Sequence, residues 1–436
     1  MLVLSLSTLD LSTIEANLER IDCIEYRLDL MPSFEFNRPP KPFIFTLRHQ
    51  MHGGAYLGSI DKLCQDILTY CQYSPDFVDL DIRLPKALFA RIRQDYPHIK
   101  IIASYHQFVC DIDQLKSYIN TDVDSDYLKL AMNCDQAIDV LHLFQLQADR
   151  PMALIPMGDK ASFGRVLGKI MGNSFDFVVP DHSQLTASGQ LCLHDIHDIY
   201  HYQHLNRETK IYALLAQPVT HSVGHLFHNQ CFRNEQRNAV YIKIEQNTSG
   251  LAQLLALMLE FPFEGLSLSM PLKQSVFPGQ TINTLVRQNG RWVGYNTDGQ
   301  AVIKLLGLEQ GMTVLILGNG GAAQGIEQAC LQQGVKVIFV ARHGKGCRFE
   351  DDIPHVDAII NTLPNQAYIE RPWFNPKLQI CICKAQKRLD IIYHEVTIFQ
   401  ELCSKQQLPF STGIDMFEAQ AQLQQELWKL ESFSTV

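Results

Sequence analysis

The sequence predicts an α/β protein of two parts, a (β/α)8 barrel followed by an α/β region that contains a doubly wound, dinucleotide-binding sheet. Two observations predict this arrangement. Eight short apolar runs alternate with segments of helical length up to about residue 205, and a glycine-rich turn, GNGGAAQG, follows another apolar run. A chain of 436 residues is also too long for one ordinary core, since domains usually hold about 100 to 200 residues.

The barrel is predicted from its strands. Runs rich in Val, Ile, Leu and Phe suit parallel strands that are buried on both faces. The intervening stretches 60–73 and 136–147 have helical periodicity. Eight repeats of strand and helix therefore predict a (β/α)8 barrel over residues 1–208. The expected strands cover residues 2–7, 25–30, 43–48, 77–82, 99–105, 127–132, 152–157 and 175–180.

A polar segment at 200–210, YHYQHLNRETK, precedes a new apolar run and predicts a domain junction, which divides the chain into residues 1–208 and 209–436. Within the second domain we expect a substrate-binding part, 209–305 with a C-terminal helix in 412–436, and a Rossmann nucleotide-binding part, 306–411. The expected strands are 211–216, 240–244, 266–270, 312–318, 335–340, 358–361 and 378–383, and an amphipathic helix is expected at 416–430.

Composition narrows the class of protein. Hydrophobic residues at 46% and charged residues at 19% are typical of a globular enzyme. The net charge of -9, without a Lys/Arg run, argues against nucleic acid, and neither a membrane span nor an export signal is expected. The scattered cysteines contain no CxxC pair, which indicates reduced thiols. We therefore expect a cytoplasmic protein, and the sequence leaves its oligomeric state open.

Polar residues close several of the predicted barrel strands, in the runs EYRLD, FTLR, DLD, SYH and YLKLA. Active sites of such barrels lie at the C-terminal ends of the strands. Lys129 stands inside an apolar run, where burial favours the neutral amine that can attack a ketone. The alternative is that Lys129 forms a structural ion pair and that His106 is a structural histidine. The recurrence of polar ends on five strands favours the functional interpretation.

In the order EYRLD, FTLR with HGG, IIASYHQF, YLKLA, IPMG and TASGQ, residues 1–205 resemble type I 3-dehydroquinate dehydratases. The resemblance implies that Lys129 forms an imine with the ketone of 3-dehydroquinate. It implies that His106 removes the C2 proton and then protonates the departing hydroxyl, and that Asp81 orients His106. The substrate-binding residues that it implies are Glu25, Arg27, Arg48, Arg165, Thr186 and Gln190.

This half departs from the family pattern at four positions. Asp81 and His52 stand where the family has Glu, and Gly164 and Thr186 stand where it has Ser. The shorter carboxylate of Asp81 predicts a weaker contact with His106. We expect this change to affect the rate more than the reaction.

The glycine turn of the second half lies between a predicted strand and a predicted helix. Glycines let a pyrophosphate approach backbone N–H groups at a helix N-terminus, although a plain tight turn is the alternative. Roughly twenty residues later the next strand ends at Arg342, where NAD-selective enzymes prefer an acidic residue, so NADP(H) is favoured. Lys273 and Asp298 suit a proton donor and its positioning carboxylate, but taken singly they read as a surface lysine and a helix N-cap.

The motifs PVTHS, SLSMPLK, INT, NTDG, DIIY and GIDM occur in the order found in shikimate dehydrogenases, which this half resembles from about residue 211 onward. The resemblance implies Lys273 and Asp298 as the catalytic pair. It implies substrate binding by Ser222, Ser269, Asn283, Tyr393 and Gln420. The implied cofactor-binding residues are Gly318, Asn319, Gly320, Gly321, Ala322, Arg342 and Gly413.

Together the two resemblances imply a bifunctional enzyme that converts 3-dehydroquinate to 3-dehydroshikimate and then to shikimate. Gly224 replaces a carboxylate-binding hydroxyl of the family, and Ser267 and Ser269 replace the commoner Asn and Thr, which leaves open a dehydrogenase retuned to quinate. A non-catalytic quinate-sensing regulator is a further alternative, but it would be expected to lose Lys129 or His106. No metal site is expected, because the His-rich stretch 194–204 is predicted to be a solvated helix.

Overall fold

The computed structural model describes residues 1–8, 11–31, 36–340, 355–370, 374–393 and 395–430. The chain divides into two compact units, residues 1–213 with 218–263, and residues 214–217 with 264–436. The segment 218–263 thus packs with the first unit, where Gln145 Nε2 donates a hydrogen bond to Glu260 at 2.7 Å. The predicted domain boundary at 208/209 falls just before a strand that begins at Lys210.

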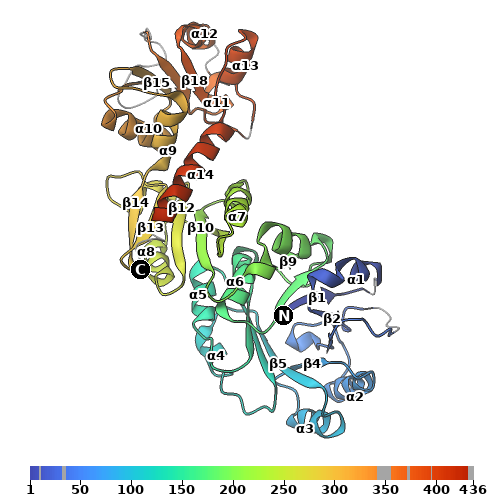
Figure 1. The fold of residues 1–436 in the computed structure, drawn as a ribbon. Helices are drawn as coiled ribbons and strands as arrows, with labels where there is room; N and C mark the ends of the chain where they lie inside the picture. Colours follow the sequence, from blue (N-terminus) through green and yellow to red (C-terminus); the bar gives the residue numbers. More distant parts are fainter. Residues whose placement is uncertain (9–10, 32–35, 341–354, 371–373, 394, 431–436) are drawn as a thin grey trace. The chain divides into compact units, whose positions relative to one another are not determined.

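The first unit is built on one curled parallel sheet in the order β7-β6-β5-β4-β3-β2-β1-β8-β9 (Figure 1). Its strands are β1 (Leu2–Leu6), β2 (Cys23–Arg27), β3 (Phe43–Thr46), β4 (Phe77–Asp81), β5 (Lys100–Gln107), β6 (Tyr127–Asn133), β7 (Met152–Met157), β8 (Asp176–Val179) and β9 (Leu191–Cys192). The helices between them are α1 (Leu11–Asn17), α2 (Ile60–Cys71), α3 (Lys86–Asp95), α4 (Ile112–Lys116), α5 (Ala137–Phe144) and α6 (Phe163–Met171).

The eight predicted strands and their barrel order are confirmed, and β9 is an addition. No ladder pairs β7 with β8 in the described residues; one hydrogen bond, from Ser174 N to Met152 O at 2.7 Å, links their starts. The rings of Phe77, Tyr127 and Phe175 pack edge to face at the N-terminal ends of their strands and fill that end of the interior. The opposite end, where the strands finish, stays open for a site.

A second sheet has the order β11-β10-β12-β13-β14. Its elements are β10 (Lys210–Ala216), α7 (Gly224–Asn234), β11 (Ala239–Glu245), α8 (Leu251–Met258), β12 (Phe263–Leu268), β13 (Thr284–Gln288) and β14 (Arg291–Tyr295). The hairpin β13–β14 was not predicted. It turns at Asn289 and Gly290, whose φ angles of 50° and 74° suit the tight turn between antiparallel strands.

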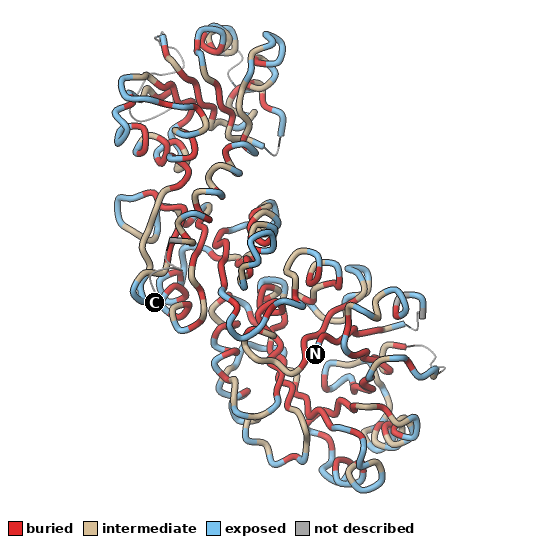
Figure 2. The backbone as a smooth tube through the Cα atoms, in the orientation of Figure 1, coloured by how far each residue is buried: buried red, intermediate tan, exposed pale blue. Residues whose placement is uncertain are grey.

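The third sheet is parallel, with the order β16-β15-β17-β18, as expected for a nucleotide-binding domain. It comprises β15 (Thr313–Leu317), β16 (Lys336–Val340), β17 (Ala358–Asn361) and β18 (Lys387–Asp390), with α10 (Gly321–Gln332), α11 (Asn365–Ile369), α12 (Phe374–Lys384) and α13 (Ile398–Lys405). Alternate residues of β15 enter two different cores: Val314 and Ile316 lie in one cluster, and Leu315 and Leu317 in another. The sheet is therefore covered on both faces, and Figure 2 shows buried residues along its strands.

The prediction of a strand at 378–383 is wrong, because these residues belong to α12. Leu378, Cys381, Ile382 and Ala385 are buried, while Ile380 is 54% exposed. This spacing of three, one and three residues follows the turn of a helix rather than the alternation of a strand.

Two helices frame the second unit's site, α9 (Thr297–Leu306) and the long α14 (Gly413–Leu430), which matches the predicted amphipathic helix. Trp428 of α14 donates from Nε1 to Leu285 O at 3.2 Å. A Cβ on Gly265 would lie 2.2 Å from that indole nitrogen, so the close approach of ring to strand requires glycine. None of the described helices combines the length and apolar character needed to cross a bilayer.

Candidate active sites

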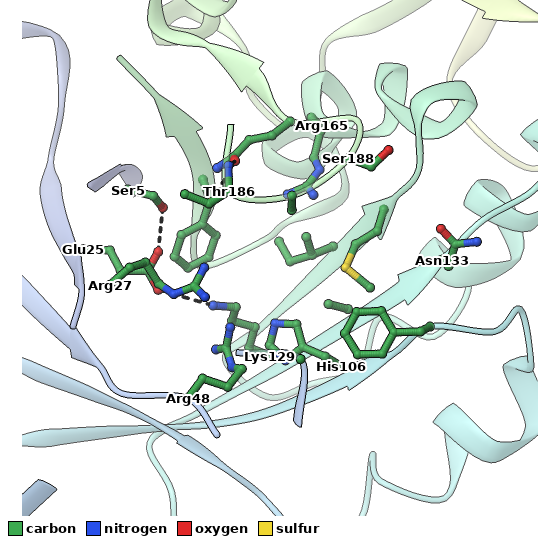
Figure 3. A pocket seen from close by; sticks show the side chains of 18 residues that line it. Ser5, Glu25, Arg27, Arg48, His106, Lys129, Asn133, Arg165, Thr186 and Ser188 are labelled. Carbon is green, nitrogen blue, oxygen red and sulfur yellow. Dashed lines mark hydrogen bonds and ion pairs between the residues drawn. The ribbon is translucent and has the colours of Figure 1, made fainter. Parts of the chain in front are cut away.

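A pocket of about 200 Å³ opens at the C-terminal ends of the barrel strands (Figure 3). Side chains two residues apart on a strand share a face, so β2 presents both Glu25 and Arg27 to the interior. The structure brings together all but one of the predicted dehydratase residues here. Those that line the pocket are Glu25, Arg27, Arg48, His106, Lys129, Arg165, Thr186 and Gln190.

Lys129 of β6 is buried among carboxylates and an aromatic ring. Its Nζ donates to Asp79 Oδ2 at 2.8 Å and lies 3.8 Å from Glu25 Oε1. The same nitrogen stands 4.0 Å from the centroid of the Phe177 ring. A buried ammonium is tolerated only with such compensation, so the surroundings account for a lysine inside an apolar strand.

Asp79 is the anion at the centre of this site. Besides Lys129, it accepts hydrogen bonds from Arg48 Nη2 at 2.9 Å and from Ser104 Oγ at 2.6 Å. Burial alone would raise the pKa of Asp79, but the adjacent Lys129 and Arg48 hold that pKa well below its ordinary value. The sequence had predicted Asp81, two residues later, as the functional carboxylate.

Asp81 differs from that expectation. Its two carboxylate oxygens accept from Arg83 Nε and Nη2 at 2.7 and 2.8 Å, and Oδ1 lies 3.7 Å from His52 Nδ1. Asp81 therefore pairs with Arg83 instead of holding His106. Asp79 and Asp81 share one face of β4, and the two-residue period alone does not distinguish them.

His106 of β5 lines the pocket beside Lys129 (Figure 3). Its Nδ1 is buried and has no hydrogen-bond partner within the described residues. Burial, followed by the charges of Arg48 and Lys129, lowers the pKa of His106 well below its ordinary value. The imidazole is therefore held neutral, which is the form that accepts a proton.

Arg165 approaches the pocket from α6. It is buried, its Nε has no partner in the described part of the chain, and burial lowers its pKa to about 10. A buried guanidinium with a free donor suits an incoming carboxylate. Across the pocket rim, the Thr186 backbone N and Oγ1 donate to Gln190 Oε1 at 3.1 and 3.0 Å.

Ser5 was missed by the sequence analysis. It lines the pocket, and its Oγ donates to Glu25 Oε2 at 2.6 Å. Ser5 on β1 is the register partner of Glu25 on β2. A serine in the middle of the otherwise apolar first strand was the available signal.

In the second unit Lys273 and Asp298 form an ion pair through Nζ and Oδ2. Lys273 lies in a short turn, Leu272–Gln274, and Asp298 lies in the first turn of α9. The N-cap of α9 is Asn296, whose side chain accepts from the backbone N of Asp298 and Gly299. The N-cap reading of Asp298 is therefore replaced by a pairing with Lys273, as a proton donor and its carboxylate would require.

Asn283 and Gln420 meet near this pair. Asn283 Nδ2 donates to Thr297 Oγ1 at 2.9 Å and to Gln420 Oε1 at 3.4 Å. Thr297, which sequence reasoning missed, is therefore a third member of the group. Ser269 follows β12, and Tyr393 is 45% exposed. Ser222 Oγ accepts from Gly224 N at 3.2 Å.

The glycine turn has room for a phosphate. Gly318 has a φ of +102°, and a Cβ there would lie 2.5 Å from Thr362 Oγ1. Gly320 is the N-cap of α10, makes no side-chain cap bond, and has nothing within 4 Å of its would-be Cβ. Open space over a helix N-terminus is what a pyrophosphate needs, so the residues fit a dinucleotide. Asn319, Gly321 and Ala322 continue this turn into α10.

The remaining predicted cofactor residues are Arg342 and Gly413. Arg342 lies outside the described residues. Gly413 begins α14, and a Cβ there would lie 2.4 Å from Ile391 O. Close packing thus already requires glycine at 413, and a role in cofactor binding stays a prediction.

The His-rich stretch also differs from the solvated helix that was expected. Residues Asp195–Ile199 form a π-helical turn and Tyr202–His204 a 3-10 turn. His197 is buried, with Nε2 2.6 Å from Arg20 O and Nδ1 3.0 Å from Gln203 Oε1. These bonds give His197 a structural role.

Comparison with known proteins gives two family matches in series. Residues 2–207 match the family described as Type I 3-dehydroquinase, and residues 214–288 match the family described as Shikimate dehydrogenase substrate binding domain. The Shikimate biosynthesis protein AroDE of Chlamydia pneumoniae is 27% identical, over 94% of this chain and 91% of that protein.

Two further relatives cover less. The chloroplastic Bifunctional 3-dehydroquinate dehydratase/shikimate dehydrogenase of Arabidopsis thaliana is 25% identical over 78% of this chain and 63% of that protein. A Shikimate dehydrogenase (NADP(+)) of Streptococcus pneumoniae (strain CGSP14) is 34% identical over 31% of this chain and 52% of that protein.

The fold and the two sites define an α/β enzyme in which a barrel with a buried lysine in its pocket precedes a dinucleotide-binding dehydrogenase. More particularly, the chain carries a type I 3-dehydroquinase domain followed by a shikimate dehydrogenase domain.

Proposed function

We propose that this chain catalyses two consecutive reactions, the dehydration of 3-dehydroquinate to 3-dehydroshikimate and the NADPH-dependent reduction of 3-dehydroshikimate to shikimate. One observation carries the proposal for the first reaction. The buried Lys129 Nζ lies in the same pocket as His106, whose pKa is lowered. Arg165, whose Nε has no partner among the described residues, lines that pocket as well. These groups supply a nucleophile, a neutral base and a carboxylate anchor.

In the first reaction Lys129 Nζ attacks the substrate ketone, and loss of water gives an imine. Asp79, 2.8 Å from that nitrogen, balances the positive charge of the protonated imine. His106 takes the C2 proton, and the electron pair of the C–H bond expels the C1 hydroxyl. The resulting imidazolium returns its proton to the hydroxyl, which leaves as water. Hydrolysis of the imine releases 3-dehydroshikimate and restores the amine.

In the second reaction the backbone N–H groups around Gly320 and Gly321 would hold the phosphates of NADPH, and the bound cofactor would supply the hydride for the substrate ketone carbon. Lys273 donates the proton that the ketone oxygen needs as it becomes a hydroxyl. Asp298 holds the ammonium in place through their ion pair. The naming of the Streptococcus pneumoniae relative as an NADP(+) enzyme supports this cofactor.

The substrate of the second site has one specific rival, quinate. A Cβ at Gly224 would make ordinary van der Waals contacts, at 3.4 Å from Ser222 Oγ and 3.5 Å from Tyr241 Oη, so glycine leaves the volume of a small side chain unfilled beside Ser222. The extra hydroxyl of quinate would find room where a side chain is missing. A cytoplasmic location and the absence of nucleic-acid and membrane partners belong to the proposal as well.

A coupled assay on the purified full chain tests both halves. When the protein is added to 3-dehydroquinate alone, the absorbance of the conjugated enone product should appear. When NADPH is then added, NADPH should be oxidised. K129M should remove the first signal and leave NADPH oxidation with supplied 3-dehydroshikimate. Enone formation without NADPH oxidation would refute the dehydrogenase half, and the absence of both signals would favour a binding protein.

A further inference from the structure

Three metal-binding side chains meet outside both sites described above, in the first unit. His182 Nε2 lies 3.1 Å from Asp195 Oδ2 and 3.5 Å from Cys192 Sγ. All three ligand atoms lie within 4.8 Å of one another. They come from three separate elements, the 3-10 turn His182–Gln184, strand β9 and the π-helical turn Asp195–Ile199.

These separations suit a shared cation. With metal–nitrogen and metal–oxygen bonds of about 2.0 Å and a metal–sulfur bond of about 2.3 Å, a tetrahedral shell spaces its ligand atoms about 3.3 to 3.6 Å apart. The observed 3.5 Å from sulfur to nitrogen falls in that interval, and the 3.1 Å from nitrogen to oxygen lies just below it. Thiolate, imidazole and carboxylate together favour zinc and its neighbours over magnesium or calcium.

We propose that His182, Cys192 and Asp195 bind a divalent transition-metal ion, zinc by the character of the ligands, with water in the fourth position. The fourth position has access to solvent, because the His182 side chain is 67% exposed. Cys192 is 3% exposed and Asp195 is 19% exposed, so the other two ligands come from the protein interior.

Binding exchanges one proton for the ion. The ion takes up the thiolate, the Nε2 lone pair of His182 and the carboxylate, and the thiol proton leaves to solvent. No electron is transferred.

The position of the site indicates what the ion would do. Between His182 and Cys192 the chain forms the segment that carries Thr186 and Gln190, both of which line the barrel pocket. One ion shared by His182 and Cys192 would tie the two ends of this segment together. Metal binding would thus restrict the pocket rim without contacting the substrate.

Cobalt(II) titration of the chelator-treated full chain tests the site, because a thiolate ligand gives a charge-transfer band in the near ultraviolet. We expect this band in the wild-type protein. Loss of an outer-shell partner alone costs about 10- to 100-fold in metal affinity, so C192S, which removes a ligand, should raise the Kd for cobalt by at least about 100-fold and abolish the band. C383S, at an exposed cysteine, and H194Q, at an exposed histidine, are matched controls that should change neither.

H182Q is a second test variant. Because the His182 side chain is largely exposed, we expect this variant to fold normally. It should weaken cobalt binding while leaving the thermal midpoint of the metal-free protein unchanged. Zinc should also slow proteolytic cleavage within residues 183–191 in the wild type and not in H182Q. A cobalt complex without the sulfur band, or equal Kd values for wild type and C192S, would overturn the proposal, whatever the outcome of the activity assays.

Discussion

Oδ2 of Asp79 lies 2.8 Å from Nζ of Lys129, and the exposed fractions of the two side chains are 1% and 6%. Oδ1 of the same carboxylate accepts from Arg48. One carboxylate thus compensates two buried cations. Since removal of one partner of a buried pair leaves an unpaired charge, Asp79 carries a larger share of the stability of this unit than its neighbour Asp81.

D79N should therefore lower the free energy of unfolding by about 3 to 5 kcal/mol. D81N is the matched control on the same strand and face, and it should cost less than half as much, because its partner Arg83 keeps 34% of its side chain exposed. Urea denaturation of both variants measures the difference. Equal losses of unfolding free energy in D79N and D81N would contradict the larger stabilising role of Asp79.

Borohydride reduction tests the imine. With 3-dehydroquinate present, the wild-type protein should gain a covalent adduct at Lys129, visible by mass spectrometry of the peptide, and K129M should gain none. H106Q should still form the adduct while kcat falls by about 10²- to 10⁴-fold, because it keeps the nucleophile and loses the base. An adduct on a different lysine would contradict the assignment.

The dehydratase should stay active on the acid side of neutrality. The pKa of His106 is lowered well below its ordinary value of 6.5 by burial and by Arg48 and Lys129. The neutral base therefore persists below pH 6.5, and the acid limb of kcat/KM should lie below that value. The lowered pKa of His106 also makes the free energy of unfolding depend on pH. Its contribution is fully present above pH 6.5 and falls below that value, because acid protonates this histidine in the unfolded chain first. An acid limb at or above pH 6.5 would contradict this reading.

In the second unit, K273M should lower kcat for NADPH-dependent reduction by about 10²- to 10⁴-fold. D298N should lower it less, since the amine remains and only its positioning carboxylate changes. Both variants should keep the wild-type dehydratase rate, which is measured on the same preparation. A loss of both activities in parallel would indicate misfolding instead of a catalytic defect.

G224S should shift the dehydrogenase from quinate toward shikimate. A Cβ at this position meets only ordinary contacts at 3.4 Å and beyond, so we expect the fold to be retained. We expect the ratio of kcat/KM for shikimate to that for quinate to rise by about 10-fold or more. S222A, which removes the neighbouring hydroxyl, should lower shikimate turnover. If G224S changes neither value, the missing hydroxyl does not select the substrate.

The parts of the fold that the sequence predicts best are those whose local pattern agrees with the tertiary environment. The strands of the barrel are buried on both faces and mostly apolar, so each one is visible as a short run such as Met152–Met157. The run at 378–383 is equally apolar but short, and periodicity does not separate a buried helix from a buried strand over six residues. Its neighbour Ala385 would have extended the helical spacing.

The site was predictable to the level of the strand and not always to the residue. His106 and Lys129 are single polar groups in apolar runs. Asp79 and Asp81 are alternatives on one face. The ladder pairs Asp81 with Ser104, yet the Ser104 hydroxyl and Lys129 Nζ both donate to Asp79, so the strand register does not predict which aspartate holds the lysine. The His182, Cys192 and Asp195 group has no regular spacing, because two different turns and strand β9 bring it together.

Helix α14 has a consequence for how the protein is made. Asn283 and Gln420 are 137 positions apart, and Gln424 donates to Thr284 Oγ1 at 3.0 Å. The last helix of the described chain thus completes the surroundings of the Lys273–Asp298 pair. The first unit is complete by Phe263, and domains fold as they leave the ribosome, at about 5 to 20 residues per second. During synthesis the nascent chain should thus acquire its dehydratase first, many seconds before the ribosome has delivered the helix on which its reductase depends.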